Sequence, residues 1–230
     1  MTSRTIAFWQ KLKRFWHAPL LNKAHSIGTQ YYKTKGVVLY RLVFGKFGKG
    51  SYIRRPLLIF NASYISIGDR VSIRDGARIE VVRHTQERIP TLYIGDDSSI
   101  EQNVHIVCHN RIHIGSKVAI SASCCILDVT HPHEDVHNPI KIVDRITNED
   151  SSVEVGDETL IGYGAVILPN VRIGKKVVIG SNSVVTGDIP DFCVAAGIPA
   201  RVLKRYEPSS GRWIRVPDLA VGERECTGLT

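Results

Sequence analysis

Isoleucine and valine recur at every sixth position along most of this chain, and that period constrains the fold more than any other feature. A two-residue slip interrupts the count twice, after Ile65 and after Ile112. A six-residue period matches neither an α-helix nor a simple strand alternation. It is the signature of a β-solenoid with one short strand per hexapeptide. The longest run comprises Val155, Ile161, Ile167, Ile173, Ile179 and Val185.

Small side chains and glycines repeat in phase with the aliphatic residues. Glycine often follows the aliphatic residue, as at Gly115 and Gly156, and a small or β-branched residue stands four positions after it, as at Val104 and Ala165. We expect the aliphatic side chains to fill a narrow triangular core, with glycine at corners that need unusual backbone angles. Each coil would bury its apolar face only against neighbouring coils.

The period divides the chain into three parts. Residues 1–50 form a basic segment that we expect to be helical, residues 51–190 form the solenoid, and residues 191–230 form a cap and tail. Loops at residues 80–93 and 127–154 interrupt the solenoid. Residues 1–68 hold 12 Lys and Arg and no Asp or Glu, so the basic excess belongs to the N-terminal part. Residues 1–20 could pack on a trimer, which we favour, or contact a membrane surface.

The rest of the composition indicates a cytoplasmic protein. No segment approaches the roughly 18 uninterrupted apolar residues of a membrane-spanning helix, and lysines and arginines interrupt any signal-peptide core near the N-terminus. The five cysteines include no CxxC pair, which favours buried thiols over a disulfide framework. We expect no nucleic-acid partner.

The loop at residues 127–154 carries the chemistry-bearing side chains. It holds His131, His133 and His137 and several carboxylates, Asp128 among them. Histidine titrates near neutral pH, so it can take a proton from a hydroxyl group during an acyl transfer. A nearby carboxylate or carbonyl could hold the imidazole in the required tautomer. The loop at residues 80–93 is polar and basic, and it fits either a solvated surface loop or an acceptor-binding element.

Together these features resemble the hexapeptide-repeat acyltransferases. The resemblance covers about Ile53 to Lys204 and is closest to the galactoside/maltose-type and lipopolysaccharide-biosynthesis O-acetyltransferases. Its motifs are Asp-Val-Thr-His-Pro at residues 128–132 and the C-terminal segment DIPDFCVAAGIPARV at residues 188–202. It implies a mainly β, left-handed parallel β-helix that acts as a homotrimer. It also implies acetyl transfer from acetyl-CoA, without a metal, to a hydroxyl of a saccharide in polysaccharide or lipopolysaccharide assembly.

The resemblance also assigns candidate site residues. His131 would be the general base, with Asp128 beside it and His133 as the alternative base or an acceptor contact. Asn103 matches an acceptor-contacting asparagine, although a turn residue at a corner is equally consistent. The predicted acetyl-CoA site comprises Gly162, Tyr163, Gly180, Ser181, Arg201, Lys204 and Arg205. The chain departs from the family pattern at Leu160, often a tryptophan, and at Gly187, often a lysine.

Three alternatives stay open at this stage. The acceptor could be the amine of a nucleotide-linked amino sugar, although the chain has no GxGxxG motif. The solenoid could be a non-catalytic binding protein, because a fold does not imply a function. It could also bind a metal, since His105, His109 and His113 are spaced by four, but a six-residue period does not bring them together.

Overall fold

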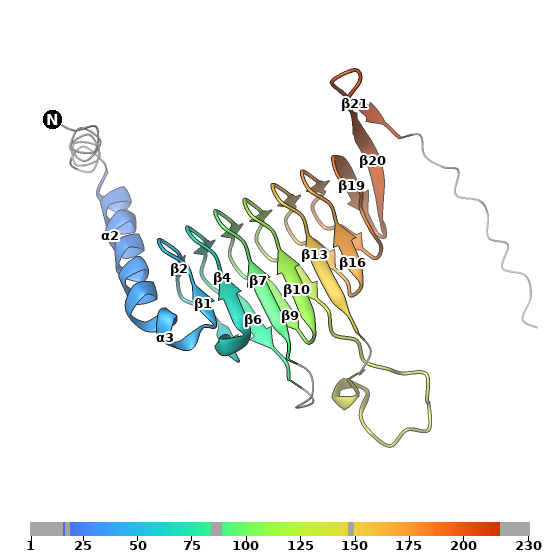
Figure 1. Ribbon diagram of the computed structural model, residues 1–230, viewed down its shortest axis with the longest axis horizontal. Helices are drawn as coiled ribbons and strands as arrows, with labels where there is room; N and C mark the ends of the chain where they lie inside the picture. The colour runs from blue at the N-terminus through green and yellow to red at the C-terminus, as the bar shows by residue number, and fades with distance from the viewer. Residues whose placement is uncertain (1–15, 17–18, 84–88, 147–149, 217–230) are drawn as a thin grey trace, which may run out of the picture.

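The computed structural model describes residue 16 and residues 19–83, 89–146 and 150–216. Within them the chain winds into a three-sided solenoid, in which strands three apart in the sequence are parallel neighbours (Figure 1). The prediction of a mainly β, left-handed parallel β-helix is confirmed.

Three sheets form the sides of the solenoid. Sheet A comprises β1 (Lys46–Phe47), β4 (Ile65–Ile67), β7 (Thr91–Ile94), β10 (Arg111–Ile114), β13 (Ser152–Val155) and β16 (Val171–Ile173). Sheet B comprises β2 (Tyr52–Ile53), β5 (Ser72–Ile73), β8 (Ser99–Ile100), β11 (Ala119–Ile120), β14 (Leu160–Ile161), β17 (Val178–Ile179), β19 (Cys193–Gly197), β20 (Ala200–Glu207) and β21 (Arg212–Arg215). Sheet C comprises β3 (Leu58–Phe60), β6 (Arg78–Val81), β9 (His105–Cys108), β12 (Cys125–Leu127), β15 (Val166–Ile167) and β18 (Val184–Val185).

The hexapeptide isoleucines and valines form the core. In the long run from Val155 to Val185, each aliphatic side chain is at most 1% exposed. The two-residue slip has a structural cause, because sheet A strands such as β4 and β10 each turn two aliphatic side chains inward. An inward residue at every second position of a longer strand adds two residues to the coil. Ile65 and Ile67 of β4 are both fully buried for this reason.

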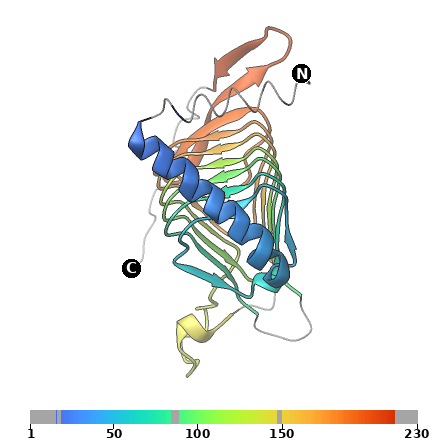
Figure 2. The same ribbon diagram turned by 90° about the vertical axis from the view of Figure 1, so that its left-hand side faces the viewer.

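A helix closes the N-terminal end of the solenoid. It runs through α2 (Leu20–Lys35), a π-helical turn η1 (Gly36–Tyr40) and α3 (Arg41–Val43), and α2 crosses the end of the solenoid obliquely (Figure 2). Tyr40, Phe44 and Phe47 pack ring to ring at centroid separations of 5.3 to 5.4 Å and plug the first coil. The helix approaches closely at Gly36, where a Cβ would lie 2.8 Å from Phe47 Cε1. The expected helix is therefore present at residues 20–43, whereas residues 1–15 lie outside the described part.

The C-terminal end is closed by an antiparallel hairpin. β19 pairs with β17 in sheet B, then β20 and β21 turn back and project beyond the last coil (Figure 1). Tyr206 on β20 packs against Trp213 on β21 at a ring separation of 5.7 Å. Two corners matter for the site. The C–A corner joins sheets C and A and comprises residues 61–64, 82–90, 109–110, 128–151 and 168–170. The B–C corner joins sheets B and C and comprises residues 54–57, 74–77, 101–104, 121–124, 162–165 and 180–183.

Candidate active site

The predicted catalytic loop projects from the C–A corner. It leaves the solenoid after Leu127 of β12 and returns at Ser152 of β13. A short 3-10 turn, η3 (Ile142–Asp144), lies in the part of the loop that returns to β13 (Figure 1). One coil earlier, the same corner is crossed by His109 and Asn110 alone. The loop is thus an insertion into a corner that the neighbouring coils cross with two residues, 109–110, or three, 168–170.

Arg145 holds this loop together. Its guanidinium donates hydrogen bonds to three backbone carbonyl oxygens of the loop, those of Asp135 at 3.0 Å, Asn138 at 2.8 Å and Ile140 at 2.7 Å. The rigid fork of the guanidinium suits such a set of acceptors. The role of Arg145 was not predictable from the sequence, because nothing in its local sequence distinguishes it from other basic loop residues.

The backbone of Arg145 also orients His131. The Nδ1 atom of the half-buried imidazole lies 3.0 Å from the carbonyl oxygen of Arg145. A carbonyl oxygen can only accept, so Nδ1 carries the hydrogen in this contact. In the neutral ring Nε2 then holds the lone pair that a general base needs. The sequence suggested either a carboxylate or a carbonyl group as the partner of this imidazole. In the structure the partner is a carbonyl group.

Asp128 lies at the root of the loop and is fully buried. Its carboxylate accepts hydrogen bonds from the backbone N–H groups of His109, Asn110 at 2.8 Å and Arg111 at 2.6 Å. Burial raises the pKa of Asp128, while these amides favour the charged form and oppose that rise. The carboxylate therefore fastens the loop to the turn of the preceding coil, and its predicted catalytic role stays a prediction.

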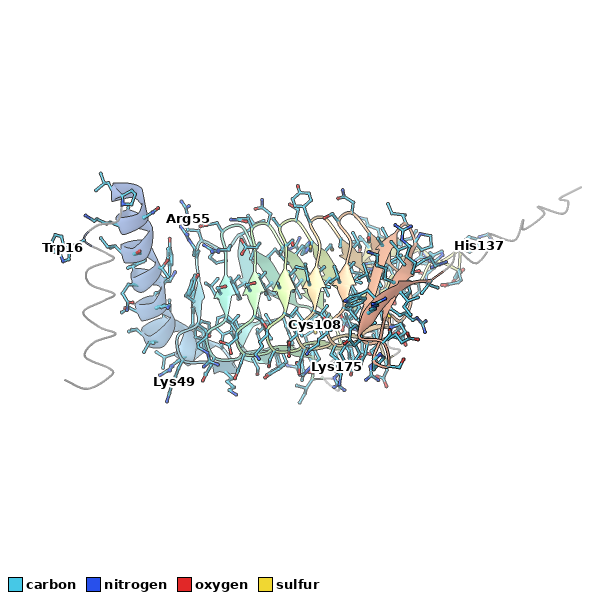
Figure 3. The ribbon with its side chains drawn as sticks, turned by 90° about the horizontal axis from the view of Figure 1, so that it is seen from above. Trp16, Lys49, Arg55, Cys108, His137 and Lys175 are labelled. Atoms are coloured by element: carbon cyan, nitrogen blue, oxygen red, sulfur yellow. The ribbon has the colours of Figure 1, made fainter. Side chains whose placement is uncertain are left out.

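The other two loop histidines are exposed. The backbone N–H of His133 donates to Glu134 Oε2 at 2.9 Å, and that of His137 donates to Asp135 Oδ1 at 3.0 Å. These bonds shape the outer part of the loop and leave both imidazoles toward solvent. Figure 3 shows His137 far from the body of the solenoid, in which Cys108 lies. Within the described part of the chain, His131 is the loop histidine whose imidazole ring has a hydrogen-bond partner.

A hollow of about 390 Å³ lies between the bases of the two long loops. Ile89 and Thr91 border it from the earlier loop, and Asp150 and Ser151 from the later one, with Asn110 and Arg111 between them. Residues 84–88 of the earlier loop lie outside the described part. The geometry makes the C–A corner a concave, polar surface beside the root of the predicted catalytic loop.

The predicted acetyl-CoA residues lie at another corner. Gly162 and Tyr163 follow β14, and Gly180 and Ser181 follow β17, so both pairs occupy the B–C corner in successive coils. Within the described residues, the backbone N–H groups of Tyr163 and Ser181 have no hydrogen-bond acceptor. Two adjacent coils therefore present donors to the surface.

Basic side chains lie close to this part of the B–C corner. Arg201 on β20 pairs in register with Ala196, whose Cβ would contact a Cβ at Gly180. Lys204 and Arg205 follow on the same strand, and all three basic residues are exposed. The hairpin thus carries positive charge beyond the last coil, near the exposed amides.

Asn103 lies at the B–C corner too, three coils before Ser181. It adopts a left-handed backbone conformation with φ 57°, and its side-chain oxygen lies over Gly76 in the coil before. This contact is structural, as expected for a turn residue. Within one chain, Asn103 and the predicted acetyl-CoA residues therefore lie at or near the B–C corner, whereas His131 lies at the C–A corner.

The three histidines spaced by four point apart. His105 lies on the outer face of sheet C, His113 stacks on Tyr93 over sheet A at 4.8 Å, and His109 is buried in the turn between them. Within the described ranges, no three His, Cys, Asp or Glu side chains come close enough to hold a metal ion.

Comparison with known proteins identifies relatives of this chain. Residues 152–187 match the family described as "Bacterial transferase hexapeptide (six repeats)". The "Putative lipopolysaccharide biosynthesis O-acetyl transferase WbbJ" of Escherichia coli (strain K12) is 31% identical over 165 residues, covering 70% of this chain and 82% of that protein.

Two further matches cover different shares of their own chains. The galactoside O-acetyltransferase of Escherichia coli (strain K12) is 34% identical over 113 residues, 49% of this chain and 53% of that protein. This chain thus spans about half of that relative. The crystal structure of a maltose O-acetyltransferase from Clostridium difficile 630 superimposes with a TM-score of 0.52 at 25% identity, covering 80% of this chain and 86% of that one.

Proposed function

The chain belongs to the family of bacterial hexapeptide-repeat transferases, and from that premise we propose that it transfers an acetyl group from acetyl-CoA to a hydroxyl group of a saccharide. The contact between His131 Nδ1 and the carbonyl oxygen of Arg145 carries this proposal. It favours the tautomer in which Nε2 can accept a proton. A sugar hydroxyl is a poor nucleophile until a base removes that proton.

In the proposed reaction His131 acts as the general base. Nε2 takes the proton of the acceptor hydroxyl as its oxygen attacks, and the protonated ring can then return a proton to the departing sulfur. The Arg145 carbonyl stabilises the imidazolium, because Nδ1–H donates to it in both protonation states. Asp128 supports this step from the root of the loop, by holding the segment that carries His131.

The donor site is proposed at the B–C corner and the C-terminal hairpin. Acetyl-CoA, when bound, supplies an acyl carbon already activated as a thioester. The N–H groups of Tyr163 and Ser181 suit the carbonyl oxygens of the donor. Arg201, Lys204 and Arg205 suit its phosphates, since exposed basic side chains make charge-assisted bonds to phosphate oxygens.

These parts require more than one subunit. His131 stands at the C–A corner, whereas Asn103 and the proposed donor residues stand at the B–C corner of the same solenoid. We therefore infer a homotrimer in which the loop of one subunit reaches the B–C corner of the next. The hollow between the two long loops, which Arg111 and Ser151 line, would take part of the sugar.

The acceptor is proposed to be a sugar of a polysaccharide or lipopolysaccharide under assembly, in the cytoplasm. This rests on the relation to a protein named for lipopolysaccharide O-acetylation and to galactoside and maltose O-acetyltransferases. The amine of a nucleotide-linked amino sugar is the competing acceptor.

A product test separates the two acceptors. The purified protein is incubated with acetyl-CoA and a panel of free, nucleotide-linked and lipid-linked sugars, and the acetylated product is isolated. An ester is cleaved by mild alkali and an amide is not. An alkali-labile acetyl group on a neutral sugar supports the proposal. An alkali-stable product formed only on amino sugars would contradict it.

A further inference from the structure

The outer side of the N-terminal helix is apolar, although it faces away from the solenoid. The inner side is occupied, because Gly36 and Tyr40 are buried and Tyr32 lies under Arg54 at 5.7 Å. On the opposite side five large exposed apolar residues recur along the helix, and we call them the apolar stripe. They are Leu20, Ile27, Tyr31, Val38 and Leu42, exposed by 82%, 62%, 63%, 65% and 84%.

The spacing of the stripe matches the helix. Steps of seven and four residues return a side chain to nearly the same side of an α-helix. The described helix continues through the π-helical turn η1 into α3, and there the exposure of Val38 and Leu42 opposite the buried Tyr40 places them on the outer side, so the stripe extends along residues 20–42. Val37, Leu39 and Val43 widen its C-terminal half and are each about half exposed. A run of large apolar side chains of this length on a protein surface marks an interaction site.

The charge around the stripe is uniformly positive. Lys23, Lys35 and Arg41 lie on the same helix, and residues 1–68 contain no Asp or Glu. Lys23 also lies 5.7 Å from the ring centre of Trp16, which is 67% exposed at the start of the helix (Figure 3). An apolar stripe with basic flanks and an exposed tryptophan is the composition of helices that lie in a membrane interface.

We propose that this end of the solenoid docks on an anionic lipid bilayer through the apolar stripe. The stripe would enter the boundary between headgroups and acyl chains, while the basic side chains pair with anionic headgroups. Among the described residues, no helix is long and apolar enough to cross a bilayer. In the proposed contact the helix lies on the surface of the bilayer. The charge complementarity with anionic lipid favours this occupant over a second copy of the chain, which would bring the same positive charge.

The position of the helix defines the orientation of the docked protein. Because α2 crosses the N-terminal end of the solenoid (Figure 2), the solenoid axis would stand away from the bilayer. The C-terminal hairpin would then lie at the end of the solenoid that is away from the lipid (Figure 1). In a cyclic trimer with parallel solenoids, all three helices would lie at the same end, so binding would be multivalent. Docking on lipid through the apolar stripe does not depend on catalysis.

Vesicle flotation of the full chain tests the proposal. We expect binding to vesicles of phosphatidylcholine containing about one third phosphatidylglycerol, weaker binding at about 0.5 M than at about 0.1 M NaCl, and none to pure phosphatidylcholine. Ile27→Glu and Ser26→Glu form a matched pair, since both introduce one carboxylate into exposed positions that are about 100° apart around the helix. Leu42→Ser removes apolar surface without adding charge.

We expect each variant to weaken the affinity for anionic vesicles by a different factor. One unit of charge near an anionic surface is worth about fivefold in affinity, so Ser26→Glu should weaken binding by about that factor. Ile27→Glu should weaken it roughly fiftyfold, because it also removes an aliphatic side chain that would enter the bilayer, and Leu42→Ser should weaken it about tenfold. Circular dichroism of each variant confirms that the fold is retained.

Three results would overturn the proposal. The first is wild-type protein that fails to float with anionic vesicles. The second is equal binding of Ile27→Glu and Ser26→Glu. The third is a fall in molar mass of Ile27→Glu or Leu42→Ser by light scattering, which would assign the stripe to contacts between copies of the chain. Because no acetyl transfer is measured, a negative result here leaves the proposed reaction standing.

Discussion

Replacing Asp128 by asparagine should destabilise the protein more than any other single exchange of a carboxylate for an amide at a corner. The two carboxylate oxygens accept from three backbone N–H groups, a buried one of His109 and partly buried ones of Asn110 and Arg111. An asparagine side chain has one acceptor oxygen and one NH₂ group. Whichever way it is turned, the NH₂ group faces at least one of these N–H donors.

The magnitude follows from those contacts. Leaving one buried N–H without an acceptor costs about 1–3 kcal/mol, and replacing two charge-assisted bonds by neutral ones loses roughly 1 kcal/mol each. Burial of the charged carboxylate is itself unfavourable, as the raised pKa of Asp128 shows. The neutral amide avoids this cost, which offsets part of the loss. We expect a net loss of about 3 kcal/mol, or a fall in Tm of roughly 6–12 °C for a domain of this size.

Thermal unfolding followed by circular dichroism, at one fixed protein concentration, measures this change. Asp157→Asn is the matched control, because Asp157 is exposed and its Oδ1 accepts one backbone N–H, that of Ser116, at 2.7 Å. The control should lose less than about 1 kcal/mol. An Asp128→Asn protein as stable as the control would refute the structural role. If it also lost acetyl transfer, a direct role of the carboxylate in catalysis would replace it.

Three further predictions concern the loop, the N-terminal helix and the outer face of sheet C. Arg145→Met should lower kcat roughly tenfold to a hundredfold by releasing the loop, with KM for acetyl-CoA unchanged, and an unaltered kcat in steady-state assays would contradict this. Gly36→Ala should lower stability by about 1–3 kcal/mol because a Cβ would lie 2.8 Å from Phe47, whereas Gly28→Ala, with open space around it, should raise stability by about 1 kcal/mol. Equal shifts in Tm would show that the close approach is unimportant. Burial lowers the pKa of His105 from 6.5, so the unfolded chain takes up this proton first as the pH falls and stability is lost below about pH 6.5. His105→Gln should therefore lose less Tm than wild type between about pH 7.5 and pH 5.5, and parallel curves would count against the assignment.

The architecture was predictable because the hexapeptide period is a direct consequence of the coil. Each aliphatic residue of the run from Val155 to Val185 is buried, and the slip at Ile65 marks the longer strands of sheet A. The position of the long loop between β12 and β13 was also predictable, because the loop interrupts that period, whereas its catalytic role stays a prediction. The helix at residues 20–43 was expected only in outline, since its end near Val43 depends on aromatic packing against the first coil.

The contacts inside the site were less accessible from the sequence. Arg145 lies 14 residues after His131 and meets it through a backbone carbonyl, which carries no residue-type signal. Asp128 appeared beside His131 in the motif, yet its carboxylate turns to amides of the previous coil, 17 to 19 residues earlier in the chain. Register between coils decides such contacts, and the period alone does not specify which polar side chains turn inward at a corner.

The most direct test of the proposed reaction compares wild type with His131→Ala and His133→Ala in the release of free thiol from acetyl-CoA. Both substitutions remove an imidazole from the same loop, but the half-buried ring of His131 is oriented by Arg145 and His133 is exposed. We predict that thiol release depends on a sugar acceptor, falls by at least about a hundredfold in His131→Ala and stays near wild type in His133→Ala. Wild-type activity in His131→Ala, or loss of activity in His133→Ala alone, would contradict the assignment of His131 as the general base.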